Sequence, residues 1–285
     1  MTVFSLQAQP TDAGSWLKLA IRAEELGFDA LLAADHPGTS ASPFVALAAA
    51  AAVTSRIRLG SNVSNAGVRE AVHLAADVAT LDVVSGGRAI VGLGAGHTPA
   101  EWEAVGRVRP GVHGRVERCV AVALAVRELL DGGLEGPRPV QDRVPMTIGT
   151  ANSRLLRWAA EHADIVGLSG LGRTLPDGHR HEARWGRAQI EHQIAQVRLG
   201  AAERKPVLEA LVQIVEVTDD ASAAAKPHAD RIGIPVEELL DAPFALIGTL
   251  DEIRAAIRRH EQQWGITRYV VREPYLEAVV PLIRQ

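Results

Sequence analysis

The stretch LDVVSGGRAIVGLGAGH, residues 81–97, contains the end of a helix, a buried strand and a glycine-rich turn, in that order. Residues 69–84 have the apolar spacing of a helix, and Gly86 and Gly87 end it because glycine readily takes the left-handed conformation of a helix end. Residues 88–93 are mostly apolar, which is typical of a strand buried on both faces. A helix followed directly by such a strand predicts an alternating α/β fold.

The same alternation extends in both directions from this stretch. A short strand near the start precedes a helix that ends at Gly27, and further strand and helix patterns follow residue 97. Between Gly170 and Gly186 the periodicity disappears, and we interpret that segment as an insertion on one face of the fold. The predicted strands cover residues 3–8, 28–34, 57–63, 88–93, 145–149, 164–169, 207–218 and 267–272.

Eight strands that alternate with helices predict a (β/α)8 TIM barrel. A barrel of this type routinely forms one domain of about 250 residues. We therefore expect residues 1–285 to be a single TIM-barrel domain with an insertion after its sixth strand. The helices are expected at residues 16–26, 44–53, 69–84, 113–130, 152–162 and 187–202, with two or three more in 221–264 and a last one that ends near 283.

The composition is that of a globular chain, with 47% hydrophobic and 22% charged residues. Because 30 basic side chains face 34 acidic ones, the net charge of −4 offers no positive excess for a nucleic-acid backbone. The most apolar stretch, residues 43–53, is about half the length of a transmembrane helix. Cys119 is the single cysteine, and no leader-like segment opens the chain. We expect a cytoplasmic protein without nucleic-acid or membrane partners.

Ionisable residues follow two of the predicted strands, at the barrel end where TIM-barrel active sites lie. Asp35 and His36 come directly after the second strand, and a histidine there suits proton transfer near neutral pH. Alternatively, Asp35 caps the next helix and His36 makes only a local hydrogen bond. His97 follows the turn Gly94-Ala95-Gly96, whose glycines would let the backbone approach a flat ligand closely, although an ordinary glycine turn explains this spacing equally well.

Two later segments could meet anionic parts of a ligand. Residues Gly149-Thr150-Ala151-Asn152-Ser153 run from the fifth strand into a helix, so free backbone amides and the helix dipole could hold a phosphate. A glycine turn before a helix is also common in any α/β protein. Residues 173–185 could form a mobile lid with the arginines 173, 180 and 184, or only a solvated surface.

Two reaction classes are disfavoured. Schiff-base chemistry needs a lysine inside the barrel, whereas Lys18 and Lys226 fall on helical stretches and Lys205 precedes the seventh strand. A metal hydrolase needs converging histidine and carboxylate ligands, and the first strand carries no His-x-His pair. We therefore expect no metal site, and we interpret Cys119 as a small apolar helix residue.

Several segments together resemble the luciferase-like monooxygenase superfamily, and most closely its branch that uses the deazaflavin coenzyme F420. The most specific match is LDVVSGGR followed by GLGAG, and the resemblance covers essentially the whole chain. The matching segments are AEELGFDA (23–30) leading into Asp35-His36, RLGSNV (58–63), LDVVSGGR (81–88) leading into GLGAG (92–96), AAEHAD (159–164), IGTLDEI (247–253) and WGI (264–266).

The resemblance implies a cofactor ring across the barrel mouth and hydride transfer at its C5. Asp35 and His36 would face the ring and substrate, with His36 as a proton donor or orienting group. Asn62 and Val63 would form a bulge, commonly with a cis peptide, behind the ring. The resemblance also implies that Gly94, Ala95 and Gly96 lie along the ring, and that Gly149, Thr150, Ala151, Asn152, Ser169 and Gly170 bind the phosphate.

One position departs from the family pattern. Some deazaflavin dehydrogenases of the superfamily carry a glutamate directly after this glycine turn, where the present chain has His97. Sugar-phosphate oxidation is therefore doubtful, and His97 becomes a candidate second acid or base.

Three functions remain open at this point. The first is an F420-dependent oxidoreductase that acts on a small molecule. The second is an FMN-dependent monooxygenase or flavin reductase, and the third is a non-catalytic flavin-binding protein. The alanine-rich helical surface at residues 46–52 could pack against a second copy in a homodimer, or within the chain.

Overall fold

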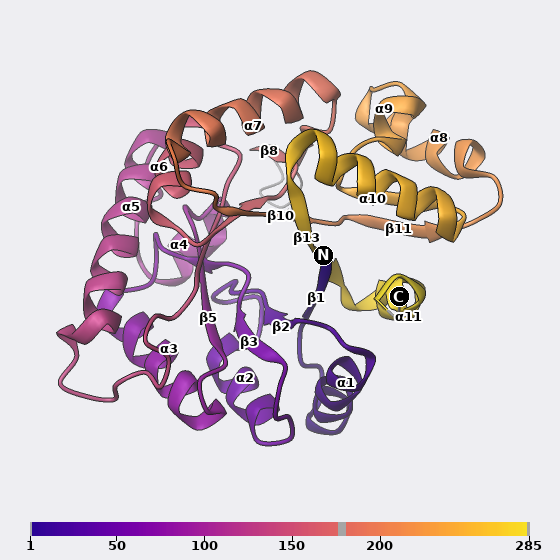
Figure 1. Ribbon diagram of the computed structural model, residues 1–285. Helices are drawn as coiled ribbons and strands as arrows, with labels where there is room; N and C mark the ends of the chain where they lie inside the picture. Colours follow the sequence, from indigo (N-terminus) through magenta and orange to yellow (C-terminus); the bar gives the residue numbers. More distant parts are fainter. Residues whose placement is uncertain (1, 176–180, 284–285) are drawn as a thin grey trace. The chain divides into compact units, whose positions relative to one another are not determined.

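The computed structural model describes residues 2–175 and 181–283 (Figure 1). The chain has the (β/α)8 TIM-barrel fold that the sequence predicts. It divides into two compact units, residues 7–149 and residues 2–6 with 150–283, which are described separately. The strand at the start, β1 (Val3–Ala8), contributes residues to both.

In the unit of residues 7–149, buried parallel strands alternate with helices. Strand β2 pairs with β3, β3 and β4 each pair with β5, and β5 pairs with β6. The elements are α1 (Ala13–Leu26), β2 (Ala30–Ala33), α2 (Pro43–Ala51), β3 (Arg58–Ser61), β4 (Ser64–Asn65), α3 (Ala71–Ser85), β5 (Ala89–Gly94), α4 (Pro99–Ala104), α5 (Val112–Glu128), a π-helical turn (Leu129–Gly133) and β6 (Met146–Gly149).

Local sequence explains where these helices begin and end. The Asp12 carboxylate accepts the backbone N–H of Ser15 and so caps the start of α1. Helices α1 and α3 end at Gly27 and Gly86, whose φ values of 89° and 71° lie in the left-handed region. The predicted helix ends at these glycines are confirmed.

The LDVVSGGR segment holds the amino-terminal end of β5 in place. Arg88 is buried and donates to the backbone carbonyls of Ala51, Thr54 and Ile57. Asp82 is also buried and accepts hydrogen bonds from the backbone N–H groups of Ala89 and Val140. The most specific part of the family resemblance therefore has a structural role, at the barrel end away from the strand ends expected to carry the site.

In the other unit, the parallel strands β7, β10 and β13 lie next to one another in that order. A second parallel pair joins β11 to β12. The elements are α6 (Ser153–His162), β7 (Ile165–Leu168), β8 (Leu171–Thr174), β9 (His181–Ala183), α7 (Arg187–Ala201), β10 (Val207–Leu211), β11 (Ile214–Val217), α8 (Ala221–Ile232), α9 (Val236–Leu240), β12 (Ala245–Gly248), α10 (Leu250–Trp264), β13 (Ile266–Arg272), a 3-10 turn (Glu273–Tyr275) and α11 (Leu276–Ile283).

The prediction of one long strand over residues 207–218 is wrong, because β10 and β11 are separate strands. The Val212 N–H donates to Val270 on β13, whereas the Gln213 N–H donates to Phe244 beside β12. The chain therefore changes its strand partner between these two residues. Strand β12 lies inside the region predicted as helical, because four apolar or glycine residues do not distinguish a strand from part of a helix.

The insertion after β7 is more regular than its composition indicates. Strands β8 and β9 pair in an antiparallel hairpin, and the residues 176–180 between them lie outside the described part of the chain.

The short helix α4 (Pro99–Ala104) is not predicted from the sequence, since six residues carry too little periodicity to be recognised. Among the described helices, none has both the length and the apolar character needed to cross a bilayer.

Candidate active site

The residues expected at the mouth of the barrel lie at strand ends within the unit of residues 7–149. Asp35 and His36 follow β2, and Asn62 and Val63 separate β3 from β4. His97 follows the glycine turn at the end of β5. The neighbouring strands bring these segments together, since Ser61 is level with Ala33, and Asn65 is level with Gly94.

Asp35 is bound to Arg69, which precedes α3. The guanidinium Nε and Nη2 lie 2.9 and 2.8 Å from the two carboxylate oxygens, and Asp35 is only 2% exposed. The hydrogen bonds to Asp35 raise the pKa of Arg69 above its ordinary value, although burial opposes this change. Both oxygens of Asp35 are therefore engaged by the protein itself.

His36 is bound to Glu101, on α4. The Nδ1 atom of the imidazole lies 2.7 Å from one carboxylate oxygen of Glu101, whose other oxygen accepts the Asn65 side-chain amide at 2.6 Å. Burial raises the pKa of Glu101, but the hydrogen bonds from His36 and Asn65 outweigh it and hold that pKa below its ordinary value. The His36 side chain is 40% exposed and Glu101 is 2% exposed, so a buried carboxylate supports an accessible imidazole.

His97 lies beside this pair. Its ring centroid is 6.0 Å from that of His36, with the two rings nearly perpendicular. The structure thus brings together Asp35, His36 and His97, the three residues that the sequence singled out for catalysis.

The bulge between β3 and β4 carries a cis peptide bond between Asn62 and Val63, which is the geometry that the resemblance implies. Gln7, at the end of β1, donates its side-chain amide to the Asn62 carbonyl at 2.6 Å. The similar Gln9 donates to the carbonyl of Ala34 at 2.7 Å. These glutamines hold the backbone of the site.

The glycines at the ends of β5 and β6 make room for the bulge rather than only for a ligand. A Cβ atom on Gly94 would lie 2.6 Å from Val63 Cγ2, and one on Gly149 would lie 3.0 Å from Val63 Cγ1. A Cβ atom on Gly96, whose φ is +71°, would lie 2.0 Å from Asn65 Oδ1. The Val63 side chain therefore rests on bare backbone, which only glycine can provide at this distance.

The expected phosphate residues that belong to the other unit lie at the start of α6 and the end of β7. Asn152 caps α6 by accepting the backbone N–H groups of Arg154 and Leu155, and Thr150 Oγ1 accepts the N–H of Asn152. Ser169 Oγ accepts the N–H of Leu171. Side chains of the protein itself thus already satisfy several amides at these turns.

Gly170 is enclosed by aromatic side chains. A Cβ atom there would lie 2.7 Å from the indole nitrogen of Trp185 and 2.8 Å from the ring of Phe244.

In the insertion, Arg173 forms an exposed ion pair with Glu182, and Arg184 donates its backbone N–H to the Gly170 carbonyl. Arg180 of the expected lid lies outside the described residues.

A family model described as luciferase-like monooxygenase matches residues 2–268. The chain belongs to this family. A 5,10-methylenetetrahydromethanopterin reductase of Methanopyrus kandleri is 31% identical to it over 190 residues, which are 57% of this chain and 54% of the reductase. The chain spans about half the length of the curated relatives it matches.

Solved structures show the same fold as this luciferase-like chain. The coenzyme F420-dependent tetrahydromethanopterin reductase of Methanopyrus kandleri has a TM-score of 0.71 at 20% identity, over 100% of this chain and 97% of that one. The oxygenating constituent of 3,6-diketocamphane monooxygenase of Pseudomonas putida, in complex with FMN, has a TM-score of 0.71 at 16% identity. This match covers 100% of this chain and 96% of that one.

Two polar residues of this luciferase-like site were missed by sequence reasoning: Arg69 and Glu101. Each lies in a segment that follows a strand end, but neither comes directly after a predicted strand, as Asp35 and His36 do. The available signal for Glu101 was its place in the first turn of the helix after the β5 glycine turn. The contacts that define its role depend on residues far away in the sequence.

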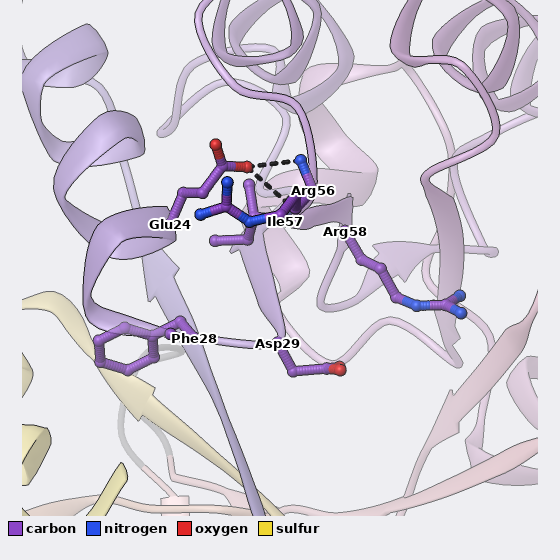
Figure 2. A pocket seen from close by; sticks show the side chains of 7 residues that line it. Glu24, Phe28, Asp29, Arg56, Ile57 and Arg58 are labelled. Atoms are coloured by element: carbon purple, nitrogen blue, oxygen red, sulfur yellow. Dashed lines mark hydrogen bonds between the residues drawn. The ribbon is translucent and has the colours of Figure 1, made fainter. Parts of the chain in front are cut away.

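A hollow of about 250 Å³ lies at the opposite ends of the strands, between the residues that precede β2 and β3. Figure 2 shows the Glu24 carboxylate reaching the backbone at Arg56 and Ile57, and its oxygen Oε2 accepts their N–H groups at 2.6 and 2.8 Å. Those bonds give Glu24 a structural role.

The described residues contain no group of three or more His, Cys, Asp or Glu side chains arranged to hold a metal ion. Cys119 is buried in α5, and burial raises the pKa of its thiol to about 12. The thiol is thus held in its protonated, weakly nucleophilic form.

Proposed function

We propose that this luciferase-like chain is a deazaflavin-dependent oxidoreductase that transfers a hydride between C5 of coenzyme F420 and a small molecule. The observation that carries the proposal is His36, an accessible imidazole held by the buried Glu101 beside the Asn62–Val63 bulge. Oxidation or reduction by hydride transfer commonly requires a proton transfer as well, and an imidazole performs it near neutral pH.

The residues at the bulge fit a flat ring. Val63 rests on the backbone of Gly94 and Gly149 and offers an apolar surface. The side-chain amides of Gln7 and Asn65 already donate hydrogen bonds within the protein. In the proposal, Asn62, Val63 and the Gly94-Ala95-Gly96 turn hold the ring. When bound, the cofactor supplies or accepts the hydride.

The other residues have separate roles in the proposed reaction. His36 transfers a proton at its Nε2 atom, and Glu101 holds the His36 imidazole through its Nδ1 atom. The pair formed by Asp35 and Arg69 fixes the end of β2, so Asp35 acts through position rather than by proton transfer. His97 is the candidate second acid or base beside His36.

We assign the cofactor phosphate to residues at the start of α6 and the end of β7. Asn152 and Thr150 already satisfy amides of this turn, so the backbone N–H groups of Ala151 and Ser153 are the donors that we assign to the phosphate. Gly170 and Ser169 are assigned to the same group. The indole N–H of Trp185, which has no hydrogen-bond partner among the described residues, is a further donor near Gly170.

The similarity to the methanopterin reductase, which extends over 57% of this chain, and the fold shared with a coenzyme F420-dependent tetrahydromethanopterin reductase support F420 as the cofactor. The family also supports a second candidate, an FMN-dependent monooxygenase or reductase, since the fold is shared with an enzyme that binds FMN. The two candidates differ in chemistry because a deazaflavin does not readily activate oxygen. A protein that only carries the cofactor needs no proton-transferring imidazole, so the His36–Glu101 pair favours an enzyme over a non-catalytic carrier.

The test is a parallel titration of the purified protein with oxidised F420 and with FMN, followed by fluorescence quenching and calorimetry. Val63→Ala removes part of the proposed ring surface, and Val45→Ala, at a 72% exposed position of α2, is the matched control. We expect F420 to bind more tightly than FMN, and Val63→Ala alone to weaken binding. Preference for FMN would establish the second candidate, and binding of neither would overturn the proposed function.

A further inference from the structure

The carboxylate of Glu101 lies between two donors. Its Oε1 atom is 2.7 Å from His36 Nδ1 and its Oε2 atom is 2.6 Å from Asn65 Nδ2. The residue is 2% exposed, so water does not compete for these oxygens. A buried carboxylate held in this way stays ionised only if both neighbours donate to it.

The orientation of Asn65 is settled by another bond. Its Oδ1 atom accepts the backbone N–H of Gly67 at 2.8 Å, so the oxygen must face Gly67 and the NH2 group must face Glu101. The Gly67 carbonyl is itself held by Arg107 and Arg118 at 2.9 and 3.0 Å. Asn65 therefore cannot turn without losing the bond that fixes its loop.

We propose that Glu101 is a positioning residue that holds neutral His36 as the Nδ1–H tautomer, so that Nε2 is the atom that accepts and returns a proton. Because an ionised carboxylate accepts only, the imidazole must donate from Nδ1. The role in catalysis rests on the proposed function, whereas the tautomer is a property of the protein without cofactor.

The other charged groups near His36 do not duplicate this effect. Asp35 precedes it in the chain, but its charge is balanced by Arg69 at 2.8 Å. Asp77 lies near Arg69, and burial raises the pKa of Asp77, against the influence of Arg69. The His97 ring lies nearly perpendicular to that of His36 and adds positive charge only when protonated. Among these described carboxylates, Glu101 is thus the one that contacts the imidazole directly.

A single substitution separates this role from a packing role. In Glu101→Gln the side-chain oxygen must face the NH2 group of Asn65, because Gly67 fixes that amide. The new NH2 group then faces His36 Nδ1, which must become an acceptor. Neutral His36 is therefore expected to change to the Nε2–H tautomer, without a change in side-chain size.

The experiment is 15N NMR of the imidazole rings in the cofactor-free protein, with His36 assigned by its loss in His36→Gln. We expect the wild type to show the Nδ1–H tautomer and Glu101→Gln the Nε2–H tautomer. Loss of the carboxylate should lower the His36 pKa by about 1 to 3 pH units. Glu103→Gln, on the exposed face of the same helix, is the control and should change neither the tautomer nor the pKa of His36.

An Nε2–H tautomer in the wild type would overturn the proposal without the need for any variant. An unchanged tautomer in a folded Glu101→Gln protein would overturn it as well. Because both measurements use the protein without cofactor, they stand apart from the F420 and FMN titrations, whose failure would overturn only the proposed function. With a substrate in hand, the acid limb of the kcat/KM profile should move to lower pH in Glu101→Gln, as the His36 pKa falls.

Discussion

Arg69 binds both carboxylate oxygens of Asp35, with its Nε at 2.9 Å from one and its Nη2 at 2.8 Å from the other. The pair links the end of β2 to the residues that lead into α3. Planar guanidinium and carboxylate groups match one another in this two-bond geometry, which fixes both side chains. The ion pair thus also fixes the backbone of the next residue, His36.

Arg69→Met should destabilise the protein by about 3 kcal/mol, because it leaves the 2% exposed Asp35 as an unpaired buried charge. Urea denaturation at pH 7 measures the loss. Arg173→Met is the control, since its ion pair with Glu182 is exposed and should contribute less than about 1 kcal/mol. Equal losses in the two variants would show that the Asp35 charge is not buried in solution.

His36→Ala should retain F420 binding and lose turnover by about 10²- to 10⁴-fold, because the general acid or base is removed while the ring surface at Val63 is kept. Binding is measured by fluorescence and turnover with a substrate found by screening. His97→Ala should have a smaller effect if His97 only assists. Unchanged turnover in His36→Ala would remove His36 from the mechanism.

Gly94→Ala should destabilise the protein by about 1 to 3 kcal/mol, because the new methyl group would meet Val63 Cγ2 at 2.6 Å. Trimming the opposing side chain should relieve this clash, so Gly94→Ala with Val63→Ala should lose less than the sum of the two single variants. Thermal denaturation of the three proteins gives the coupling. Gly111→Ala, where a Cβ atom meets nothing within 4 Å, is the control. Additive losses would argue against contact between the two positions.

His260 should make the protein sensitive to acid. It is fully buried between the Tyr269 hydroxyl at 2.9 Å and the Asp241 carbonyl at 3.1 Å, and burial lowers its pKa from 6.5 to about 4. Between these values the unfolded chain binds a proton that the folded chain does not, so stability falls as the pH falls. From pH 7 to pH 5 we expect this histidine to lower the free energy of unfolding by about 2 kcal/mol.

Urea denaturation of the wild type and of His260→Gln at both pH values measures this contribution. The variant is less stable at pH 7, but its loss between pH 7 and pH 5 should be smaller by about 2 kcal/mol. The comparison removes the effect of carboxylates, which titrate in both proteins. Parallel pH dependence in the two proteins would mean that His260 is protonated at its ordinary pKa.

Local sequence patterns were sufficient for the barrel strands and for the helix ends. Apolar runs of four to seven residues indicate buried strands, and helical periodicity indicates the helices between them. Glycines such as Gly27 and Gly86 mark the helix ends, because their backbone takes the left-handed conformation. The same patterns placed Asp35, His36 and His97 at strand ends. They failed between β10 and β11, where the apolar run continues but the partner strand changes.

The sequence by itself determined the barrel, the order of its strands and the segments that reach its mouth, because periodicity and turn residues act within a few positions of the chain. Only the tertiary structure decided which side chains of those segments bind one another. His36 and Glu101 are 65 positions apart, and Asp35 and Arg69 are 34 apart. Such pairs depend on which strand ends meet in space, and no local pattern encodes that distance.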